Sequence, residues 1–180
     1  MLVMNPHAKP KTTPKKPIRI LFLDVDGVLN CRATEEHCGS YRGIDDPKVK
    51  LLKEIIDATG ALIVLISSWK NEWYRSEQFK YKQDLLANYL DIKLAKFGLK
   101  ASAKVPDESF DGRGKNIAAY LKALKQKRIP VASYAILDDE EQDYAKTGLV
   151  PHVVKTDFEH GGLKKEHVKQ AIAMLLPQEE

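Results

Sequence analysis

Two aspartates, Asp24 and Asp26, follow a short apolar run over residues 20–23 and are joined to a glycine, Gly27. The run is rich in strand-favouring residues and too brief for a core helix, so it predicts a buried strand. Alternate residues of an extended chain point to opposite faces, so both carboxylates face one site only if a turn begins at Asp26. Two converging carboxylates repel each other unless one is protonated or a cation lies between them, and oxygen ligands suit Mg²⁺. Asp-Gly is also a common turn, so these residues alone leave a simple polar turn open.

Two serines, Ser67 and Ser68, follow a second apolar run over residues 61–66. The segment between the runs has acids and a proline at positions 45–47 and apolar residues at helical spacing, and it predicts a helix that ends near residue 59. A strand, a helix and a strand form a right-handed unit with parallel strands, which places the serines at the same sheet edge as Asp24. A hydroxyl there can bind an anion or cap the next helix.

Two more acids, Asp138 and Asp139, end a third apolar run over residues 131–137, and Asp143 follows shortly after. Carboxylates at the end of a buried strand are costly without a counter-ion, so they indicate a cation site at the carboxyl edge of the sheet. The same residues are also compatible with a solvated charged turn.

Two cations, Arg113 and Lys115, alternate with glycines where a helix is predicted to open, near residue 111. Backbone donors, the helix dipole and fixed positive charge together favour an anion at such a place. The spacing is not that of a P-loop. A solvated basic turn stays open as the alternative.

Taken in order, these segments resemble the four motifs of the haloacid dehalogenase (HAD) superfamily of phosphotransferases. The most specific match is the apolar strand followed by Asp-x-Asp-Gly at residues 24–27. The resemblance implies that Asp24 is a nucleophile that forms an aspartyl-phosphate and that Asp26 is the general acid/base. It also implies a Mg²⁺ cofactor held by Asp24, by the backbone carbonyl of Asp26 and by Asp138, with Asp139 as a direct or water-mediated ligand and Asp143 in support.

The two remaining motifs imply groups that bind the transferring phosphoryl group. Ser67 is the expected hydroxyl, with Ser68 as the adjacent alternative. Lys115 is the expected cation and Arg113 the second choice, while Lys104 also stays open.

The predicted fold is α/β and Rossmann-like, with a central, mostly parallel sheet flanked by helices. Further helices are predicted over residues 71–97 and 164–176 and a further strand over residues 149–154, whereas residues 99–110 have no clear pattern and Pro106 favours a loop. The aromatic residues that follow Ser68, such as Trp69, are interpreted as core or groove lining. Residues 31–44 are long enough for a flap or hairpin but not for a cap domain.

The amino-acid sequences of the motifs also resemble those of the HAD domains associated with RNA repair proteins. Within the HAD superfamily, members without a cap domain tend to act on large substrates. This resemblance implies removal of end phosphates from nucleic acid. A small-molecule phosphatase for nucleotides or sugar phosphates is the alternative, and a non-catalytic binding module is a further one.

The composition fits one soluble domain: 180 residues, 30% charged and 43% hydrophobic, with a net charge of +4. We expect a loosely attached basic tail over residues 1–17 and the phosphatase domain over residues 18–180, and the tail is either a contact for nucleic acid or a solvated leader. The sequence has no long apolar segment, so we expect no membrane contact and a cytoplasmic location. In that compartment Cys31 and Cys38 are expected to be ordinary thiols.

Overall fold

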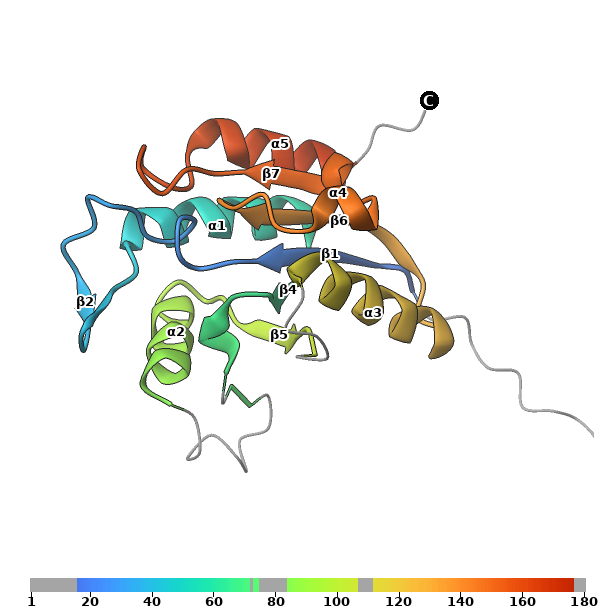
Figure 1. The fold of residues 1–180 in the computed structure, drawn as a ribbon, viewed down its shortest axis with the longest axis horizontal. Coiled ribbons are helices and arrows are strands. Elements are labelled where there is room, and N and C mark those ends of the chain that lie inside the picture. The colour runs from blue at the N-terminus through green and yellow to red at the C-terminus, as the bar shows by residue number, and fades with distance from the viewer. Residues whose placement is uncertain (1–15, 72, 75–83, 107–111, 177–180) are drawn as a thin grey trace, which may run out of the picture.

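The protein is built on a five-stranded parallel sheet, seen in a computed structural model that describes residues 16–71, 73–74, 84–106 and 112–176 (Figure 1). The strand order is β5-β4-β1-β6-β7, and each neighbouring pair is parallel. The strands are β1 (Ile18–Leu23), β4 (Leu62–Leu65), β5 (Ala101–Lys104), β6 (Val131–Asp138) and β7 (Val153–Lys155). The predicted α/β fold with a parallel sheet is confirmed.

Helices cover both faces of this sheet (Figure 1). They are α1 (Asp46–Thr59), α2 (Leu85–Ala95), α3 (Arg113–Gln126), the short α4 (Tyr144–Thr147) and α5 (Lys165–Leu175), with 3-10 turns η1 (Ser68–Lys70) and η3 (Val150–His152). Leu21 and Leu23 of β1 pack in one apolar cluster with α1, α2 and α5. The alternate residues Ile20 and Phe22 pack in a second cluster with α3 and α4. The alternation of β1 side chains therefore separates two cores, one on each face.

The register brings the carboxyl ends of three strands together at one edge. Leu23, the last residue of β1, pairs with Leu65 of β4 and Leu137 of β6. The ladder continues past β1, because Asp24 N–H donates to the carbonyl of Leu137 at 3.0 Å. Polar residues that follow these three strands must therefore be neighbours.

A two-stranded hairpin, β2 (His37–Cys38) and β3 (Tyr41–Arg42), lies between β1 and α1 in the chain. It is tied to α2 by Tyr89, whose hydroxyl donates to Glu36 at 2.5 Å and accepts from the N–H of Ile44 at 3.2 Å. The short hairpin predicted for residues 31–44 is confirmed, and the described residues form no separate cap domain.

Three elements differ from the predictions. Of the helix predicted over residues 71–97, the described residues form only α2, which Asp84 caps by accepting from Ala87 N–H at 2.8 Å. Trp73 lies outside any helix, and residues 72 and 75–83 lie outside the described part. Strand β5 was missed because its Ala-Ser-Ala-Lys sequence has too little apolar surface to signal an edge strand. The strand predicted over residues 149–154 begins only at Val153, after a 3-10 turn that contains Pro151.

The predicted basic tail falls almost wholly on residues 1–15, outside the described part, so its boundary stays a prediction. Cys31 and Cys38 are both free and buried, as expected for ordinary thiols. Among the described residues, no helix has the length and apolar character that crossing a bilayer requires.

Candidate active site

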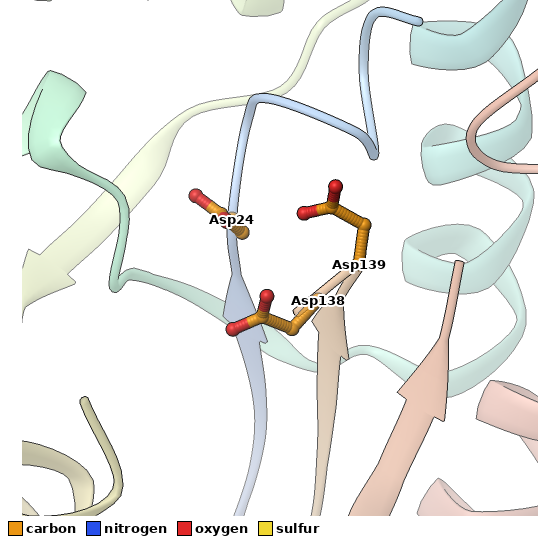
Figure 2. Close-up of side chains that lie close together, drawn as sticks. All are labelled: Asp24, Asp138 and Asp139. Carbon is orange, nitrogen blue, oxygen red and sulfur yellow. The ribbon is translucent and has the colours of Figure 1, made fainter. Parts of the chain in front are cut away.

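Three carboxylates meet at the carboxyl edge of the sheet: Asp24 after β1, and Asp138 and Asp139 at the end of β6 (Figure 2). One oxygen of each lies within 4.8 Å of those of the other two. Asp24 is 3% exposed and Asp138 is fully buried, whereas Asp139 is half-buried. The structure thus brings together the three carboxylates that were predicted to bind the metal directly or through water; Asp26 was predicted to contribute its backbone carbonyl.

Neighbouring donors hold the two buried carboxylates in place. Asp24 Oδ1 accepts from the N–H of Val25 at 2.8 Å. Asp138 Oδ1 accepts from the N–H of Glu140 at 2.9 Å, and its Oδ2 accepts from the hydroxyl of Tyr144. These bonds restrain the orientation of both carboxylates. The role of Tyr144 was not anticipated, because a tyrosine six residues past a strand gives no sequence signal.

Arg113, the first residue of α3, is the cation that contacts these acids. Its Nη1 lies 2.5 Å from Asp24 Oδ2 and 2.6 Å from Asp138 Oδ2. Lys115, the first choice from the sequence, has an exposed side chain. The Lys104 ammonium donates to the carbonyl of Lys70 at 3.0 Å. The geometry therefore favours Arg113, the second choice.

The start of α3 is anchored by a carboxylate from another element. Asp143 Oδ1 accepts from the N–H of Gly114 at 2.6 Å and its Oδ2 from the N–H of Lys115 at 3.1 Å. A Cβ on Gly112 would lie 2.2 Å from an oxygen of this carboxylate, which explains the glycine. The sequence predicted that backbone amides at this helix start would bind an anionic ligand, but the N–H groups of Gly114 and Lys115 donate to the Asp143 carboxylate instead. Asp143 thereby positions the start of α3 and Arg113.

The carboxylate of Asp26 is exposed and is not part of the three-acid group. Its Oδ1 accepts from the side-chain amide of Asn30 at 2.8 Å, and its Oδ2 accepts from the indole N–H of Trp69 at 2.8 Å. Asn30 in turn accepts from the N–H of Gly27 at 3.0 Å. Trp69, interpreted from the sequence as core or groove lining, thus also orients a predicted acid/base.

Gly27 allows the turn over residues 26–29 that follows the two aspartates of the first motif. Its φ of +69° lies in the left-handed region. A Cβ at this position would lie 2.1 Å from Cγ of Asp139. The residue must therefore be glycine both for its conformation and for the close approach of Asp139.

Ser67 is buried at the end of β4, at the same edge as Asp24. Its Oγ accepts from the N–H of Trp69 at 3.3 Å, so Ser67 caps the turn η1. Capping and anion binding were the two roles predicted for this hydroxyl. A hydroxyl that accepts one bond still has its proton to donate to a phosphoryl oxygen. Ser68 lies within η1 and is exposed.

Burial and mutual repulsion make the acids of the site reluctant to ionise. Burial, with the charge of Asp138, raises the pKa of Asp24 from 3.8 to about 7, although Arg113 opposes the rise. Burial and Asp138 likewise raise the pKa of Asp139 to about 6. Burial disfavours the charge of Arg113, but Asp24 and Asp138 outweigh it and raise its pKa above its usual value. With all three acids ionised, the site would carry more negative charge than Arg113 alone balances.

This donor set fits a divalent cation. Its three carboxylates supply hard oxygen ligands within 4.8 Å of one another. A guanidinium already bridges two of them, so positive charge is stabilised at this position. Three carboxylates, one guanidinium and one divalent ion together carry no net charge, which offsets part of the cost of burying them.

A cavity of about 830 Å³ lies away from this site. It is lined by residues near the end of α3, such as Lys125 and Arg128, and by Val131, the first residue of β6. Asp138 is the last residue of β6, so the cavity and the carboxylates lie at opposite edges of the sheet.

Comparisons with known proteins agree with this architecture. A crystal structure from Mesorhizobium loti, described as a HAD-like phosphatase, superposes with a TM-score of 0.51 at 11% identity and covers 91% of this chain and 89% of that chain. At this identity the likeness shows the fold alone. No curated protein sequence matches the chain.

The family assignment comes from the sequence model for the HAD domain in Swiss Army Knife RNA repair proteins, which matches residues 20–168. The match covers most of the chain and includes every residue of the site. It confirms the identification as a HAD-type phosphatase domain that was made from the four motifs. The chain belongs to the HAD domain family of Swiss Army Knife RNA repair proteins.

Proposed function

We propose that this protein is a Mg²⁺-dependent phosphomonoesterase that acts through an aspartyl-phosphate on phosphorylated ends of nucleic acid. The observation that carries the chemistry is the group formed by Asp24, Asp138 and Asp139 with Arg113 bridging the first two. Such a group provides a nucleophile, a cation site and a phosphate-binding cation at one place.

Asp24 is the nucleophile of the first step. Its carboxylate oxygen attacks phosphorus, a P–O bond to Asp24 forms, and the P–O bond to the leaving group breaks. Asp26 donates its proton to the leaving oxygen. The bonds from Asn30 and Trp69 hold the Asp26 carboxyl group at the mouth of the site for this transfer.

Water completes the reaction in a second step. Asp26, now ionised, takes a proton from a water molecule, whose oxygen attacks the phosphorus of the aspartyl-phosphate. The bond between phosphorus and Asp24 breaks, which releases phosphate and restores the Asp24 carboxylate and the protonated Asp26. One residue thus serves as acid and then as base.

The equatorial oxygens of the phosphoryl group need positive charge and hydrogen-bond donors. Arg113, which contacts Asp24, supplies the first and Ser67 the second. Mg²⁺ held by Asp24, Asp138 and Asp139 would offset the charge repulsion between the nucleophile and the phosphate.

Two features favour a polynucleotide over a small metabolite. The family is named for RNA repair proteins. Among the residues that the structure describes, the segment between β1 and α1 forms only the hairpin β2–β3 and no cap domain that would enclose a small substrate, which favours a large substrate.

The test compares substrates and metal. Purified protein with Mg²⁺ is expected to release phosphate from an aryl phosphate and, at a higher kcat/KM, from a 3′-phosphorylated oligonucleotide. EDTA should abolish both activities and added Mg²⁺ should restore them. A higher kcat/KM on mononucleotides would replace the polynucleotide assignment with a small-molecule phosphatase, and no turnover of any phosphate ester would overturn the enzyme proposal.

A further inference from the structure

Helix α3 differs from the other long helices in its charge. The segment from its first residue to residue 128 has cations and no Asp or Glu: Arg113, Lys115, Lys122, Lys125, Lys127 and Arg128. In contrast, α1, α2 and α5 each include at least one acidic residue. Positive charge is therefore concentrated on one helix in a chain whose net charge is only +4.

Three of the exposed cations in this segment also have no salt bridge of the kind that holds some lysines elsewhere. Several exposed lysines on other elements pair with carboxylates: Lys53 with Asp57, Lys155 with Glu141 and Lys165 with Glu54. Across the described residues, Lys122, Lys125 and Arg128 have no carboxylate partner within salt-bridge distance. Their charges are thus available to a ligand.

Spacing along the helix places three of these cations on one side. Lys115, Lys122 and Lys125 are separated by seven and three residues, which puts them in one row on a helix. All three are exposed, whereas Ile117 and Leu124 face the core. We call the row, extended by Arg128 just past the end of the helix, the α3 surface.

The α3 surface leads away from the carboxylate site. Arg113 at one end of the helix contacts Asp24, and beyond the other end the carbonyl of Pro130 accepts from the N–H of Ile18, the first residue of β1. Helix α3 therefore runs alongside β1, as Figure 1 shows. Its 14 residues span about 21 Å at 1.5 Å per residue, so a small phosphate ester bound at Asp24 cannot reach the far cations.

We propose that the α3 surface binds the phosphate backbone of a single-stranded nucleic acid whose terminal phosphate lies at Asp24. For its class of substrate this inference rests on the proposed function. A length of about 21 Å corresponds to about six stacked nucleotides at 3.4 Å each. The proposed contacts are to phosphates, so they do not depend on the nucleotide sequence. The row ends at Lys125 and Arg128, which also line the cavity of about 830 Å³.

The test removes charge from the middle of the row. Lys122→Ala/Lys125→Ala is compared with Lys50→Ala/Lys169→Ala, which removes the same charge from exposed lysines of α1 and α5 on the other face of the sheet. Binding of a fluorescent, 3′-phosphorylated ten-nucleotide strand is measured by anisotropy in an Asp24→Asn background, where turnover is blocked. The α3 variant should bind about tenfold more weakly at low salt, and its salt slope should fall by about 1.4, because each lost phosphate contact on a single strand contributes about 0.7. The control variant should bind as its parent does.

Hydrolysis of an aryl phosphate, measured without the Asp24 substitution, separates this inference from the proposed function. Both double variants should keep kcat/KM on that substrate within about twofold. Equal weakening of strand binding in the two variants, or an unchanged salt slope, overturns the inference. An active phosphatase that binds no oligonucleotide overturns the inference but remains consistent with the proposed phosphatase activity. A protein that hydrolyses neither substrate but shows the expected binding pattern overturns the proposed function and leaves the α3 surface standing.

Discussion

Arg113 Nη1 lies 2.5 Å from Asp24 Oδ2, so the first residue of α3 is in direct contact with the carboxylate that follows β1. The same nitrogen lies 2.6 Å from Asp138 Oδ2. One guanidinium therefore joins the ends of two neighbouring strands and balances part of their charge. A metal ion at this site must share its acids with Arg113.

Arg113→Ala is expected to lower kcat on an aryl phosphate about 100-fold, because it removes the cation that we propose to stabilise the transferring phosphoryl group. Lys115→Ala is the matched control: it removes a cation two residues further along α3 and should change kcat less than about threefold. Steady-state kinetics with a small substrate make the comparison. Equal losses in the two variants would show that Arg113 lacks the role that its contacts suggest.

Gly27→Ala is expected to weaken Mg²⁺ binding about 10- to 100-fold, because the added Cβ would displace Asp139, whose Cγ lies 2.1 Å from its position. Gly60→Ala is the control. Gly60 has a similar φ of +65°, but nothing lies within 4 Å of an added Cβ there. Both variants should lose about 1–2 kcal/mol of stability from backbone strain. Titration calorimetry measures the Mg²⁺ affinity of both variants, which separates the effect on the site from the loss of stability that backbone strain causes in both. Equal metal affinities in the two variants would exclude Asp139 as a ligand.

Trp69→Phe is expected to lower kcat about tenfold with little change in KM, because Asp26 loses the indole N–H that orients it while the ring packing is kept. The control is Trp73→Phe, which removes an indole N–H that donates at 3.0 Å to Asp91. Both proteins should remain folded by circular dichroism. A kcat for Trp69→Phe equal to that of the control would mean that this bond does not position the acid/base.

In EDTA the protein is expected to lose stability relative to Asp24→Asn as the pH rises from about 4 to 7. The unfolded chain releases the proton of Asp24 near pH 3.8, whereas the folded protein holds it up to about pH 7. The folded state therefore binds more protons within this window, so its free energy of unfolding falls as pH rises. The difference between the two proteins should reach at most about 4 kcal/mol.

Urea unfolding at several pH values provides this measurement, with Asp57→Asn on the exposed surface of α1 as a control that should track the wild type. Saturating Mg²⁺ should reverse the order of wild type and Asp24→Asn. A constant difference across the pH range would show that burial does not perturb Asp24.

The strands and acids of the site could be predicted because each depends on a local pattern. A short apolar run followed by polar residues signals both a buried strand and its carboxyl end, and this holds for Asp24, Ser67 and Asp138. Parallel pairing then places all three ends at one edge. The sequence pattern therefore predicts that Asp24 and Asp138 meet, whereas it does not show that the Asp26 carboxylate lies outside their group.

The contacts that depend on distant residues could not be predicted. The choice between Arg113 and Lys115 depends on how α3 is rotated, which is set by Asp143 binding the amides of Gly114 and Lys115 from another element. Trp69 reaches Asp26 across 43 positions of sequence, and no local pattern signals that bond. Strand β5 was missed for a different reason, because its small side chains give no apolar alternation.

The most direct test of the covalent mechanism is to capture the phosphorylated enzyme. Wild-type protein with Mg²⁺ and an aryl phosphate is quenched in acid during turnover, reduced with borohydride and analysed by peptide mass spectrometry. Reduction of an aspartyl-phosphate leaves homoserine, so the account predicts homoserine at position 24 only, and none in EDTA. Sustained turnover with an unmodified Asp24, or homoserine at another position, would contradict it.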